Sequence, residues 1–356
     1  MGRTSLFFIT FVYNCNGMKK ITIKDVAREA GVSVTLVSFV MNAKVGPDGR
    51  LDCPVNPDTA ARVLDVAKRL GYRRNVAAAS LRSGRSNTIA VITTDISNNF
   101  FAGISRYIED KAVQYGYTVL FGSSDEKAEK LNNVMDTVLA YNIDGVIVAP
   151  VPGGEEAVRK AIDAKVPVVL LDRDQEGIEG VGKVLLDDVE AGEMATELLF
   201  EKGYRKIEMI SYDLGISSIS ERERGYRKVM EKHGLEPHVN CTSYGDPENL
   251  IPVIINDALS RGVEAFFLPT YSLTAMVIRV MNRLHLRTPR DLGIVAFDES
   301  DLYCLGPSTI AHIVQPLKEL GEDSVEVLHS MIEGEPGDKI IILKPSLVPG
   351  GSVKGM

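Results

Sequence analysis

The fold of the N-terminal part follows from the stretch Ile21-Thr22-Ile23-Lys24-Asp25-Val26-Ala27-Arg28-Glu29-Ala30-Gly31-Val32-Ser33-Val34-Thr35-Leu36-Val37-Ser38-Phe39-Val40-Met41-Asn42. Apolar residues recur at helical spacing on both sides of Gly31, which is placed to end the first helix, and Ser33 is suited to cap a second one. In that second segment the residues expected to face inward are Leu36, Val37, Val40 and Met41. Two short helices joined by a three-residue turn predict a helix-turn-helix.

More helices are predicted before residue 88. Thr22 and Asp25 resemble a capping pair for the first helix. Asn56 as cap, Pro57 at the first helical position and an apolar run closed by Gly71 predict a third helix, after a loop over residues 43–56. Residues 75–83 predict a two-turn helix, which would be marginal alone because isolated helices shorter than about 12–15 residues seldom persist.

From residue 88 onward, apolar β-branched runs alternate with longer amphipathic stretches. The expected strands are Thr88–Ile92, Thr118–Phe121, Gly145–Ala149, Val166–Leu171, Lys206–Ile210, Ala265–Leu268 and Leu292–Ala296. The expected helices are Phe101–Gln114, Glu129–Tyr141, Glu155–Ala164, Ala191–Lys202, Arg222–His233 and Leu273–Leu284. This alternation is typical of parallel βαβ units and is long enough for two sheets. The expected fold class is an all-α helix-turn-helix head followed by an α/β body.

The charge of the chain is divided unevenly between these parts. The 356 residues carry a formal net charge of −8, which by itself would argue against a nucleic-acid partner. Residues 1–87, however, hold 14 Lys plus Arg against 6 Asp plus Glu, a balance of +8, so residues 88–356 carry −16. A small basic head on a large acidic body points to a polyanion partner for the head alone.

Many spaced positions agree with one known family. They include Ile23-Lys24-Asp25-Val26-Ala27, Ala30-Gly31-Val32-Ser33, Val37-Ser38, Asn42, Arg62-Val63, Leu70-Gly71-Tyr72-Arg73, Asn75, Ala79, Leu81-Arg82, Gly84, Asn87-Thr88-Ile89, Phe100-Phe101, Gly116-Tyr117, Asp144-Gly145-Val146-Ile147, Leu171-Asp172-Arg173, Arg222, Gly225-Tyr226 and Phe297-Asp298. The sequence therefore resembles the lactose-repressor (LacI/GalR) family of transcriptional regulators over roughly residues 20–345, most specifically in 21–89.

The resemblance implies a domain plan. A helix-turn-helix DNA-binding domain is expected over residues 18–74, a hinge helix and linker over 75–87, and an effector-binding and dimerisation domain over 88–350. The last resembles periplasmic sugar-binding proteins, with two Rossmann-like lobes. The N-lobe is expected at about 88–175 and 315–332, and the C-lobe at about 176–314 and 333–350. Residues 1–17 are expected to be an unstructured extension, because Met18-Lys19-Lys20 resembles a natural start.

For DNA recognition, the residues near the N-terminus of the second helix are the ones that reach base edges in the major groove. The resemblance assigns base contact to Val34, Thr35 and Phe39. Phe39 cannot donate a hydrogen bond to guanine, so it either contacts a thymine methyl or sugar, or belongs to the core. The expected phosphate contacts, which fix register without reading sequence, are Thr22, Ser33, Ser38, Asn42, Arg73, Asn75 and Arg82.

Leu81 is assigned a distinct role by the resemblance. In the family the hinge helices of a dimer pair in the minor groove, where this leucine wedges into the central base step. Such apolar wedges unstack a step for a few kcal/mol, recovered through the contacts that bending allows. The alternative is ordinary linker packing. A homodimer on a pseudo-palindromic double-stranded DNA operator is expected, because the hinge helices need a partner.

Effector contacts are expected in the loops that follow the strands, where ligands of open α/β sheets bind. The candidates are Asn98, Phe100, Phe101, Ser124, Asp172, Arg173, Ser218, Arg222, Asp246, Tyr271 and Asp298. Carboxylates with an aromatic platform suit a sugar or sugar derivative, although any single Asp here can equally be a helix cap. Ile216, Thr270-Tyr271 and Pro247 depart from residues common in the family. An atypical effector, a phosphorylated partner protein or no small effector therefore remains open.

An enzyme is not expected. The sequence has no GxGxxG after a strand, no GxxxxGK[ST], no GxSxG and no HExxH, and its five His and four Cys are scattered, so neither a cofactor nor a metal is predicted. The apolar run 6–12 is too short to span a membrane or to serve as a convincing export signal. The sequence thus predicts a cytoplasmic, allosteric DNA-binding regulator. Repression is the family habit, but the sequence does not fix the sign, the effector or the operator.

Overall fold

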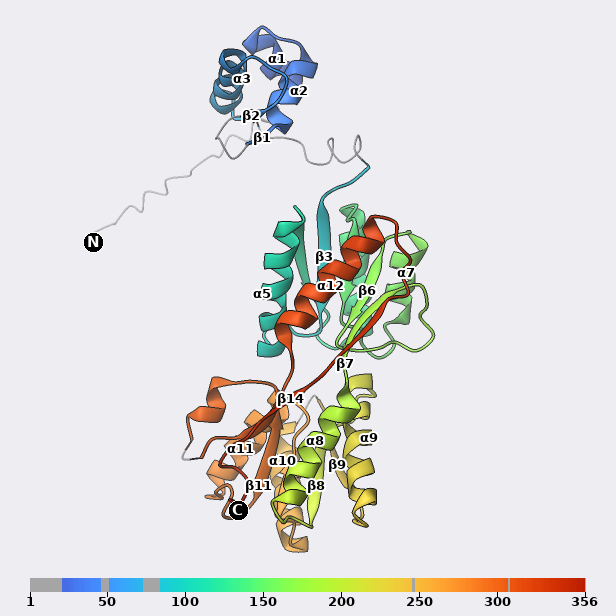
Figure 1. The fold of residues 1–356 in the computed structure, drawn as a ribbon, viewed down its shortest axis with the longest axis vertical. Coiled ribbons are helices and arrows are strands. Elements are labelled where there is room, and N and C mark those ends of the chain that lie inside the picture. Colours follow the sequence, from blue (N-terminus) through green and yellow to red (C-terminus); the bar gives the residue numbers. More distant parts are fainter. Residues whose placement is uncertain (1–20, 46–50, 73–83, 245–246, 307, 356) are drawn as a thin grey trace, which may run out of the picture. The chain divides into compact units, whose positions relative to one another are not determined.

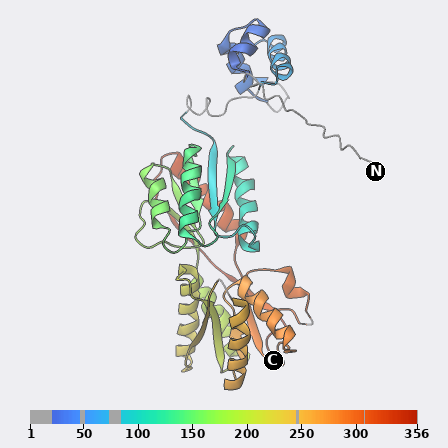
Figure 2. The same cartoon turned by 180° about the vertical axis from the view of Figure 1, so that it is seen from behind.

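A computed structural model describes residues 21–45, 51–72, 84–244, 247–306 and 308–355 (Figures 1 and 2). The chain divides into two compact units, Met1–Ser83 and Gly84–Met356, here called the head and the body. The division falls after Ser83, a few residues before the boundary at 87 that the sequence predicts. Most of the predicted hinge helix lies outside the described residues.

The head contains the three predicted helices, α1 (Ile23–Ala30), α2 (Val34–Asn42) and α3 (Pro57–Arg69). A small antiparallel pair, β1 (Lys44–Val45) and β2 (Leu51–Asp52), lies in the predicted loop. The caps form as expected. The Asp25 carboxylate accepts from the Thr22 backbone N–H at 3.0 Å, and Ser33 Oγ accepts from the Leu36 N–H at 3.2 Å. Gly31 ends α1 with a left-handed φ of 65°.

The first lobe of the body is built on a six-stranded parallel sheet in the order β13-β7-β6-β5-β3-β4. The strands are β3 (Thr88–Thr93), β4 (Thr118–Ser123), β5 (Gly145–Val148), β6 (Val168–Leu171), β7 (Gly182–Leu186) and β13 (Ile340–Leu343). Helices α5 (Asn99–Gln114) and α12 (Leu317–Ile332) pack on one face. Helices α6 (Ala128–Ala140) and α7 (Glu155–Asp163) pack on the other. Both faces of the sheet are thus buried, as parallel sheets require.

The second lobe has a six-stranded sheet in the order β14-β12-β11-β10-β8-β9, parallel except for β14. Its strands are β8 (Ile207–Tyr212), β9 (His238–Thr242), β10 (Ala265–Phe267), β11 (Gly293–Phe297), β12 (Ala311–Val314) and β14 (Ser346–Val348). Helices α8 (Asp188–Glu201) and α9 (Ser217–Lys232) cover one face. Helices α10 (Pro247–Arg261) and α11 (Tyr271–Arg283) cover the other, and a short 3₁₀ helix, η1 (Asp301–Cys304), follows β11.

The predicted lobe boundaries are wrong in two places. Residues 176–186 and 333–343 were expected in the second lobe, yet β7 and β13 lie in the sheet of the first. The physical reason is that these two strands pair with each other in parallel, Ile340 opposite Lys183, at the edge of that sheet. The chain therefore crosses between the lobes after β7, after β12 and after β13 (Figure 1). Among the described residues, no helix has the length and apolar character that a membrane span needs.

Candidate functional site

Helix α2 presents a mixed apolar and polar face to solvent. Val37 and Val40 are buried in the head core, whereas Val34 is 40% exposed, Phe39 is 50% exposed and Thr35 is exposed. The alternative that Phe39 belongs to the core is therefore wrong. The three residues assigned to base contact lie on a free surface of the second helix of a helix-turn-helix, which is the element that enters the major groove.

The predicted phosphate-contacting residues of the head make local hydrogen bonds. Asn42 Nδ2 donates to Ser38 Oγ at 3.1 Å, which places both side chains together on α2. Ser33 Oγ accepts the cap bond, so its hydroxyl hydrogen is left to donate. The Thr22 hydroxyl, in contrast, donates to Asp25 at 2.7 Å and is used within the cap. Arg73, Asn75, Leu81 and Arg82 lie outside the described residues.

The segment that leads into β3 is fastened to the first lobe. The Asp144 carboxylate accepts from the Ser86 and Asn87 backbone N–H groups, each at 2.7 Å, and from Ser86 Oγ at 3.0 Å. Arg85 forms an ion pair of 2.5 Å with Glu333, just beyond the end of α12. Because residues 85–87 are bonded to the loop before β5 and to Glu333 beyond α12, a movement of the first lobe can also move the start of the linker.

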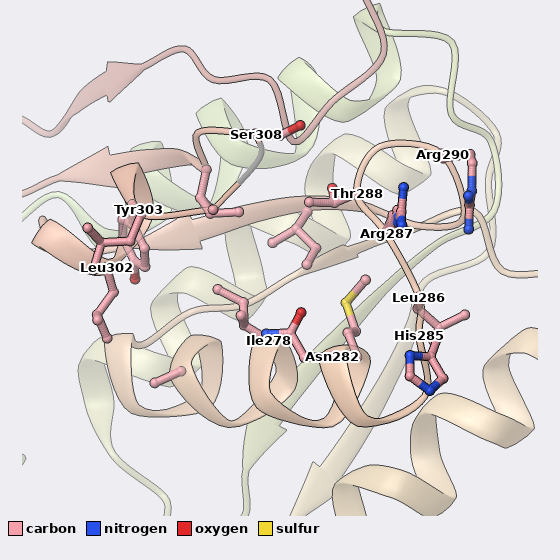
Figure 3. A pocket seen from close by; sticks show the side chains of 16 residues that line it. Ile278, Asn282, His285, Leu286, Arg287, Thr288, Arg290, Leu302, Tyr303 and Ser308 are labelled. Atoms are coloured by element: carbon pink, nitrogen blue, oxygen red, sulfur yellow. The ribbon is translucent and has the colours of Figure 1, made fainter.

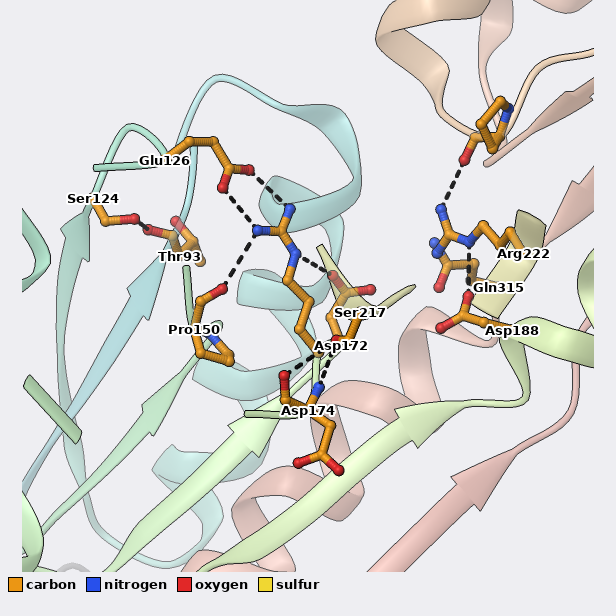
Figure 4. A network of polar contacts seen from close by, with 12 residues as sticks. Thr93, Ser124, Glu126, Pro150, Asp172, Asp174, Asp188, Ser217, Arg222 and Gln315 are labelled. Carbon is orange, nitrogen blue, oxygen red and sulfur yellow. Dashed lines mark hydrogen bonds and ion pairs between the residues drawn. The ribbon is translucent and has the colours of Figure 1, made fainter. Parts of the chain in front are cut away.

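Seven polar residues lie at the facing ends of the two lobes, and we call them the interlobe cluster: Glu126, Asp172, Arg173, Asp188, Arg222, Asp298 and Gln315. Figure 4 shows the contacts that Glu126 and Asp172 make in the first lobe and those that Arg222 makes in the second. The first three residues of the cluster follow the carboxyl ends of β4 and β6 in the first lobe. The others lie at the start of α8, on α9, and after β11 and β12. This is the edge at which open α/β sheets bind ligands.

Arg173 is clamped by an acidic residue of its own lobe. Both oxygens of Glu126 accept from the guanidinium, each at 2.8 Å, in a bidentate pair. The carbonyl of Pro150 accepts a further bond at 3.4 Å, and Asp172 Oδ2 lies 3.4 Å from Nε. Because both partners of the Arg173–Glu126 pair are nearly buried, the pair holds the β4 and β6 loops together.

Arg222 is held in the same way in the second lobe. Its Nε donates to Asp188 Oδ1 at 2.7 Å and its Nη1 to the Pro269 carbonyl at 2.8 Å, while the guanidinium lies 3.7 Å from the centre of the Phe297 ring. Close packing of α8 on α9 sets this geometry. A Cβ on Gly192 would meet the Arg222 carbonyl, and one on Gly225 would meet the Val189 carbonyl. The two glycines thus let α9 bring Arg222 to Asp188.

Asp298 connects two further parts of the second lobe. Gln315 Nε2 donates to its Oδ1 at 2.7 Å, and the Tyr271 backbone N–H donates to its Oδ2 at 3.2 Å. Both Asp298 and Asp172 adopt a left-handed backbone, with φ of 66° and 69°. Such conformations are uncommon for residues other than glycine, and they concentrate at functional sites.

Several buried polar atoms of the cluster have no hydrogen-bond partner. They are Asp172 Oδ1, Arg173 Nε and Gln315 Oε1. Burial also raises the pKa of Asp172 and Asp298, and it raises the pKa of Asp188 to about 7, against the opposing effect of Arg222. Buried polar groups are almost always satisfied in folded proteins, so this concentration of unsatisfied atoms indicates a ligand site.

The other predicted effector residues lie around the cluster with different roles. Asn98 caps α5, its Oδ1 accepting from the Phe100 N–H at 3.0 Å, and Ser124 Oγ donates to the Thr93 carbonyl at 3.4 Å. Phe101 is 2% exposed and lies in the core of the first lobe, so of the two aromatics only Phe100 lines a cavity with Asp298 and Gln315.

The remaining predictions lie at the second lobe. Ser218 is buried, and its neighbour Ser217 makes the bonds across the lobes, to the N–H and carbonyl of Asp174 at 3.0 and 3.1 Å. The Tyr271 ring lies 6.4 Å from that of Tyr303. Asp246 lies outside the described residues.

Sequence reasoning missed Glu126, Asp188, Gln315 and Tyr244. Glu126 and Gln315 come shortly after strands, and Asp188 begins a helix. A position after a strand is the same feature that led us to predict Asp172 and Asp298 as effector contacts. Tyr244 is 40% exposed and its ring meets that of Tyr212 edge-on at 5.3 Å. Burial and the carboxylates Glu126 and Asp95 of the first lobe raise the pKa of Tyr244, against the opposing effect of Arg173.

Cavities of different character lie in the described part of the body. The cavity at the cluster, lined by Asn99, Phe100, Asp298, Glu299, Gln315 and Leu317, measures about 20 Å³, which is room for about one water molecule. A larger one of about 870 Å³ lies in the second lobe between α11, the 285–290 segment and η1 (Figure 3). Its rim carries Leu302 and Leu305, which are 47% and 76% exposed. None of the seven cluster residues lines it, and its exposed leucines suit a protein surface better than a polar ligand.

Comparisons with known proteins match both units. Residues 22–75 match the family described as bacterial regulatory proteins, lacI family, and residues 89–336 match the periplasmic binding protein domain. Catabolite control protein A of Priestia megaterium is 30% identical over 329 residues, covering 91% of this chain and 96% of that protein.

Two solved structures are also similar. One is a putative ribose operon repressor from Burkholderia thailandensis, 26% identical with a TM-score of 0.68, covering 74% of this chain and 99% of that one. The other is a lac repressor dimer bound to operator and an anti-inducer, 22% identical with a TM-score of 0.78, covering 95% of this chain and all of that one.

Proposed function

The chain belongs to the lacI family of bacterial regulatory proteins and is a DNA-binding transcription regulator rather than an enzyme, and we propose that a sugar or related polyol controls its operator affinity. The observation that carries the effector proposal is the interlobe cluster, in which buried polar atoms of Asp172, Arg173 and Gln315 lack partners. Hydroxyl groups both donate and accept hydrogen bonds, so a polyol can satisfy all three atoms.

On the DNA side, we assign base reading to Val34, Thr35 and Phe39. Their exposure on α2 supports this assignment. Val34 and Phe39 carry no hydrogen-bond donor, so their contribution is apolar contact with thymine methyl groups, and Thr35 adds a hydroxyl. In the proposal Ser33, Ser38, Asn42, Arg73, Asn75 and Arg82 supply phosphate contacts, whereas both hydrogen-bond donors of Thr22 are used within the cap.

We further propose a homodimer that binds a pseudo-palindromic operator. A two-fold protein matches two half-sites, and paired hinge helices would insert Leu81 of each protomer into the minor groove. The face with Leu302 and Leu305 supports a contact between copies, because a monomer seldom exposes two neighbouring leucines beside a large cavity. The similar lac repressor structure is a dimer bound to operator.

The effector proposal draws on a relative as well. The similar structure from Burkholderia thailandensis is named a putative ribose operon repressor, so the name of at least one protein of similar fold links it to a sugar. The cavity beside Asp298 and Gln315 measures about 20 Å³, which is too small for a sugar, and we propose that the lobes separate to admit one. Movement of the lobes about the three crossing segments is the proposed conformational change.

Coupling to DNA would run through the first lobe. Asp144 and Glu333 fasten residues 85–87 to that lobe, so its movement repositions the start of the linker. A coupling free energy of about 1–3 kcal/mol, typical of allosteric proteins, would change operator affinity about 5- to 150-fold. We propose repression as the outcome and the cytoplasm, where the DNA lies, as the location.

Two experiments test this function. A gel shift of genomic fragments with the full-length protein should reveal specific complexes that weaken as salt rises, because phosphate contacts release counterions. A thermal-shift screen against sugars and polyols should raise the Tm for at least one of them. Absence of any specific fragment contradicts the DNA assignment, and a flat sugar screen contradicts the effector assignment.

A further inference from the structure

We propose that the effector is an uncharged, hydroxyl-rich molecule such as an unphosphorylated sugar, and that Glu126 excludes its phosphorylated form. This inference rests on the proposed effector site and deepens it, because it states which chemical form of the ligand binds. Three independent features of the interlobe cluster lead to it: its charge, the engagement of its guanidinium groups, and the kind of hydrogen bond that it still offers.

The cluster contains more acidic than basic side chains. Among the described residues it contains four carboxylates, Glu126, Asp172, Asp188 and Asp298, against the guanidinium groups of Arg173 and Arg222. Burial raises the pKa of Asp172, Asp188 and Asp298 and so opposes their ionisation, but Arg173 and Arg222 are each already paired with a carboxylate. A phosphate group adds about 1.5–2 further negative charges, and in a buried site such like-charge repulsion is only weakly screened.

The two cations of the cluster are already engaged. Glu126 occupies both outer nitrogens of Arg173, with two bonds of 2.8 Å, and Asp188 and the Pro269 carbonyl accept from Nε and Nη1 of Arg222. Proteins bind phosphate most effectively through the open fork of an arginine. In Arg173 that fork is filled by a carboxylate of the same chain, so an incoming phosphate would have to displace Glu126.

The free hydrogen-bonding atoms favour a donor ligand. Two acceptors, Asp172 Oδ1 and Gln315 Oε1, lack partners, whereas the one donor without a hydrogen bond, Arg173 Nε, already lies 3.4 Å from Asp172 Oδ2. The orientation of the Gln315 amide is fixed by chemistry, since its nitrogen must face the Asp298 carboxylate to which it donates. A fully ionised phosphate only accepts, whereas each sugar hydroxyl can donate to Asp172 or Gln315 and accept from Arg173.

The backbone presents Glu126 for this role. Asp125 and Glu126 both adopt left-handed φ values, 50° and 56°, in the loop after β4. Ser123 Oγ and Lys130 Nζ each donate to Asp125, at 3.0 and 2.6 Å, and brace the loop from outside the cluster. The Glu126 side chain is thereby directed inward, where it is 8% exposed against Arg173.

The test compares matched ligands on the full-length protein. Calorimetry and thermal shift are run with D-ribose and ribose 5-phosphate, D-glucose and glucose 6-phosphate, and D-fructose and fructose 6-phosphate. For the wild type we expect at least one free sugar to bind and its phosphate to bind at least tenfold more weakly. Glu126→Gln removes one negative charge and loosens the clamp on Arg173, so the ratio should fall at least tenfold. Glu129→Gln, at an exposed position in the first turn of α6, is the matched control and should leave the ratio unchanged.

The outcomes separate this inference from the proposed function. A phosphorylated sugar that binds the wild type as tightly as its free form overturns the inference while the effector site stands. A folded Glu126→Gln protein with an unchanged ratio also overturns it, because Glu126 then does not select. If neither form of any sugar binds, both the effector site and the inference fail. Circular dichroism establishes folding, and Glu126→Ala replaces Glu126→Gln should the latter not fold.

Discussion

Single residues of the interlobe cluster combine strong pairing with the penalty of burial. Asp188 is the clearest case. Its carboxylate accepts a hydrogen bond of 2.7 Å from Arg222 Nε, and the residue is only 5% exposed. Burial raises its pKa to about 7, far above the ordinary value of 3.8. The residue is therefore held in a state that resists ionisation near neutral pH, as expected at a ligand site.

The raised pKa of Asp188 predicts how stability depends on pH. Below about pH 7 the folded protein takes up a proton that the unfolded chain, with its pKa near 3.8, does not bind until the pH falls further. This group therefore adds stability as pH falls from about 7.5 to 5, by at most about 1.4 kcal/mol per pH unit. In thermal unfolding, the Tm of the wild type minus the Tm of Asp188→Asn should increase as the pH falls through that range. Parallel pH profiles would contradict it.

Leu81 carries the prediction for DNA bending. Leu81→Ala removes the proposed minor-groove wedge and should weaken operator binding about tenfold or more, while sugar affinity stays unchanged. Leu81→Met keeps an apolar side chain of similar size and should retain most of the binding. Fluorescence anisotropy on operator duplexes measures both variants. Operator affinity that is unchanged in Leu81→Ala would rule out the wedge.

At the scale of elements, the contact of α8 with α9 determines where Arg222 lies. Gly192 and Gly225 allow the helix backbones to approach so closely that a Cβ at either position would meet a carbonyl oxygen. The pairing of Arg222 with Asp188 depends on this spacing, because one residue comes from each helix. The helix packing and the ligand site are thus one structural unit.

Gly225→Ala is expected to separate these helices. The added methyl would meet the Val189 carbonyl, so α9 must shift and carry Arg222 away from Asp188. Overpacking of this kind costs about 1–3 kcal/mol of stability, and sugar affinity should fall by at least tenfold. Ser220→Ala, at an exposed position of α9, is the control. Calorimetry that finds wild-type sugar affinity in Gly225→Ala would contradict the proposed role of this packing.

The sequence predicted the elements better than their partners. Periodicity and caps identified α1 to α3 and most of the parallel strands, because those signals are local. The placement of β7 and β13 was not local, since Ile340 pairs with Lys183 more than 150 residues earlier. Likewise Asp172 and Arg222 stood out from the family resemblance, whereas the inward direction of the Glu126 side chain depends on two left-handed residues in the loop after β4, a conformation that the sequence does not predict.

The molecule as a whole separates its charges according to function. Residues 1–87 carry a balance of +8 and residues 88–356 carry −16. Phosphate attraction is thereby confined to the part that reads DNA, while the acidic body is repelled from the duplex. The charge division that first argued for a polyanion partner agrees with the family to which the chain belongs.

The proposed dimer predicts a concentration-dependent assembly. Leu305 is 76% exposed beside the cavity at α11, so Leu305→Asp should weaken association by placing a charge in the contact, and operator affinity should fall with it. Val253→Asp, at an exposed position of α10, is the matched control. Analytical ultracentrifugation measures both. A Leu305→Asp protein that associates as the wild type does would place the contact elsewhere.

The central claim is that occupancy of the interlobe cluster changes operator affinity. Its most direct test is anisotropy of the full-length protein on an operator duplex, selected by gel shift, with and without the sugar that raises the Tm. We predict specific binding that weakens with salt, and a shift of about 5- to 150-fold in operator Kd when the sugar is present. An operator Kd that stays the same at saturating sugar would contradict the claim.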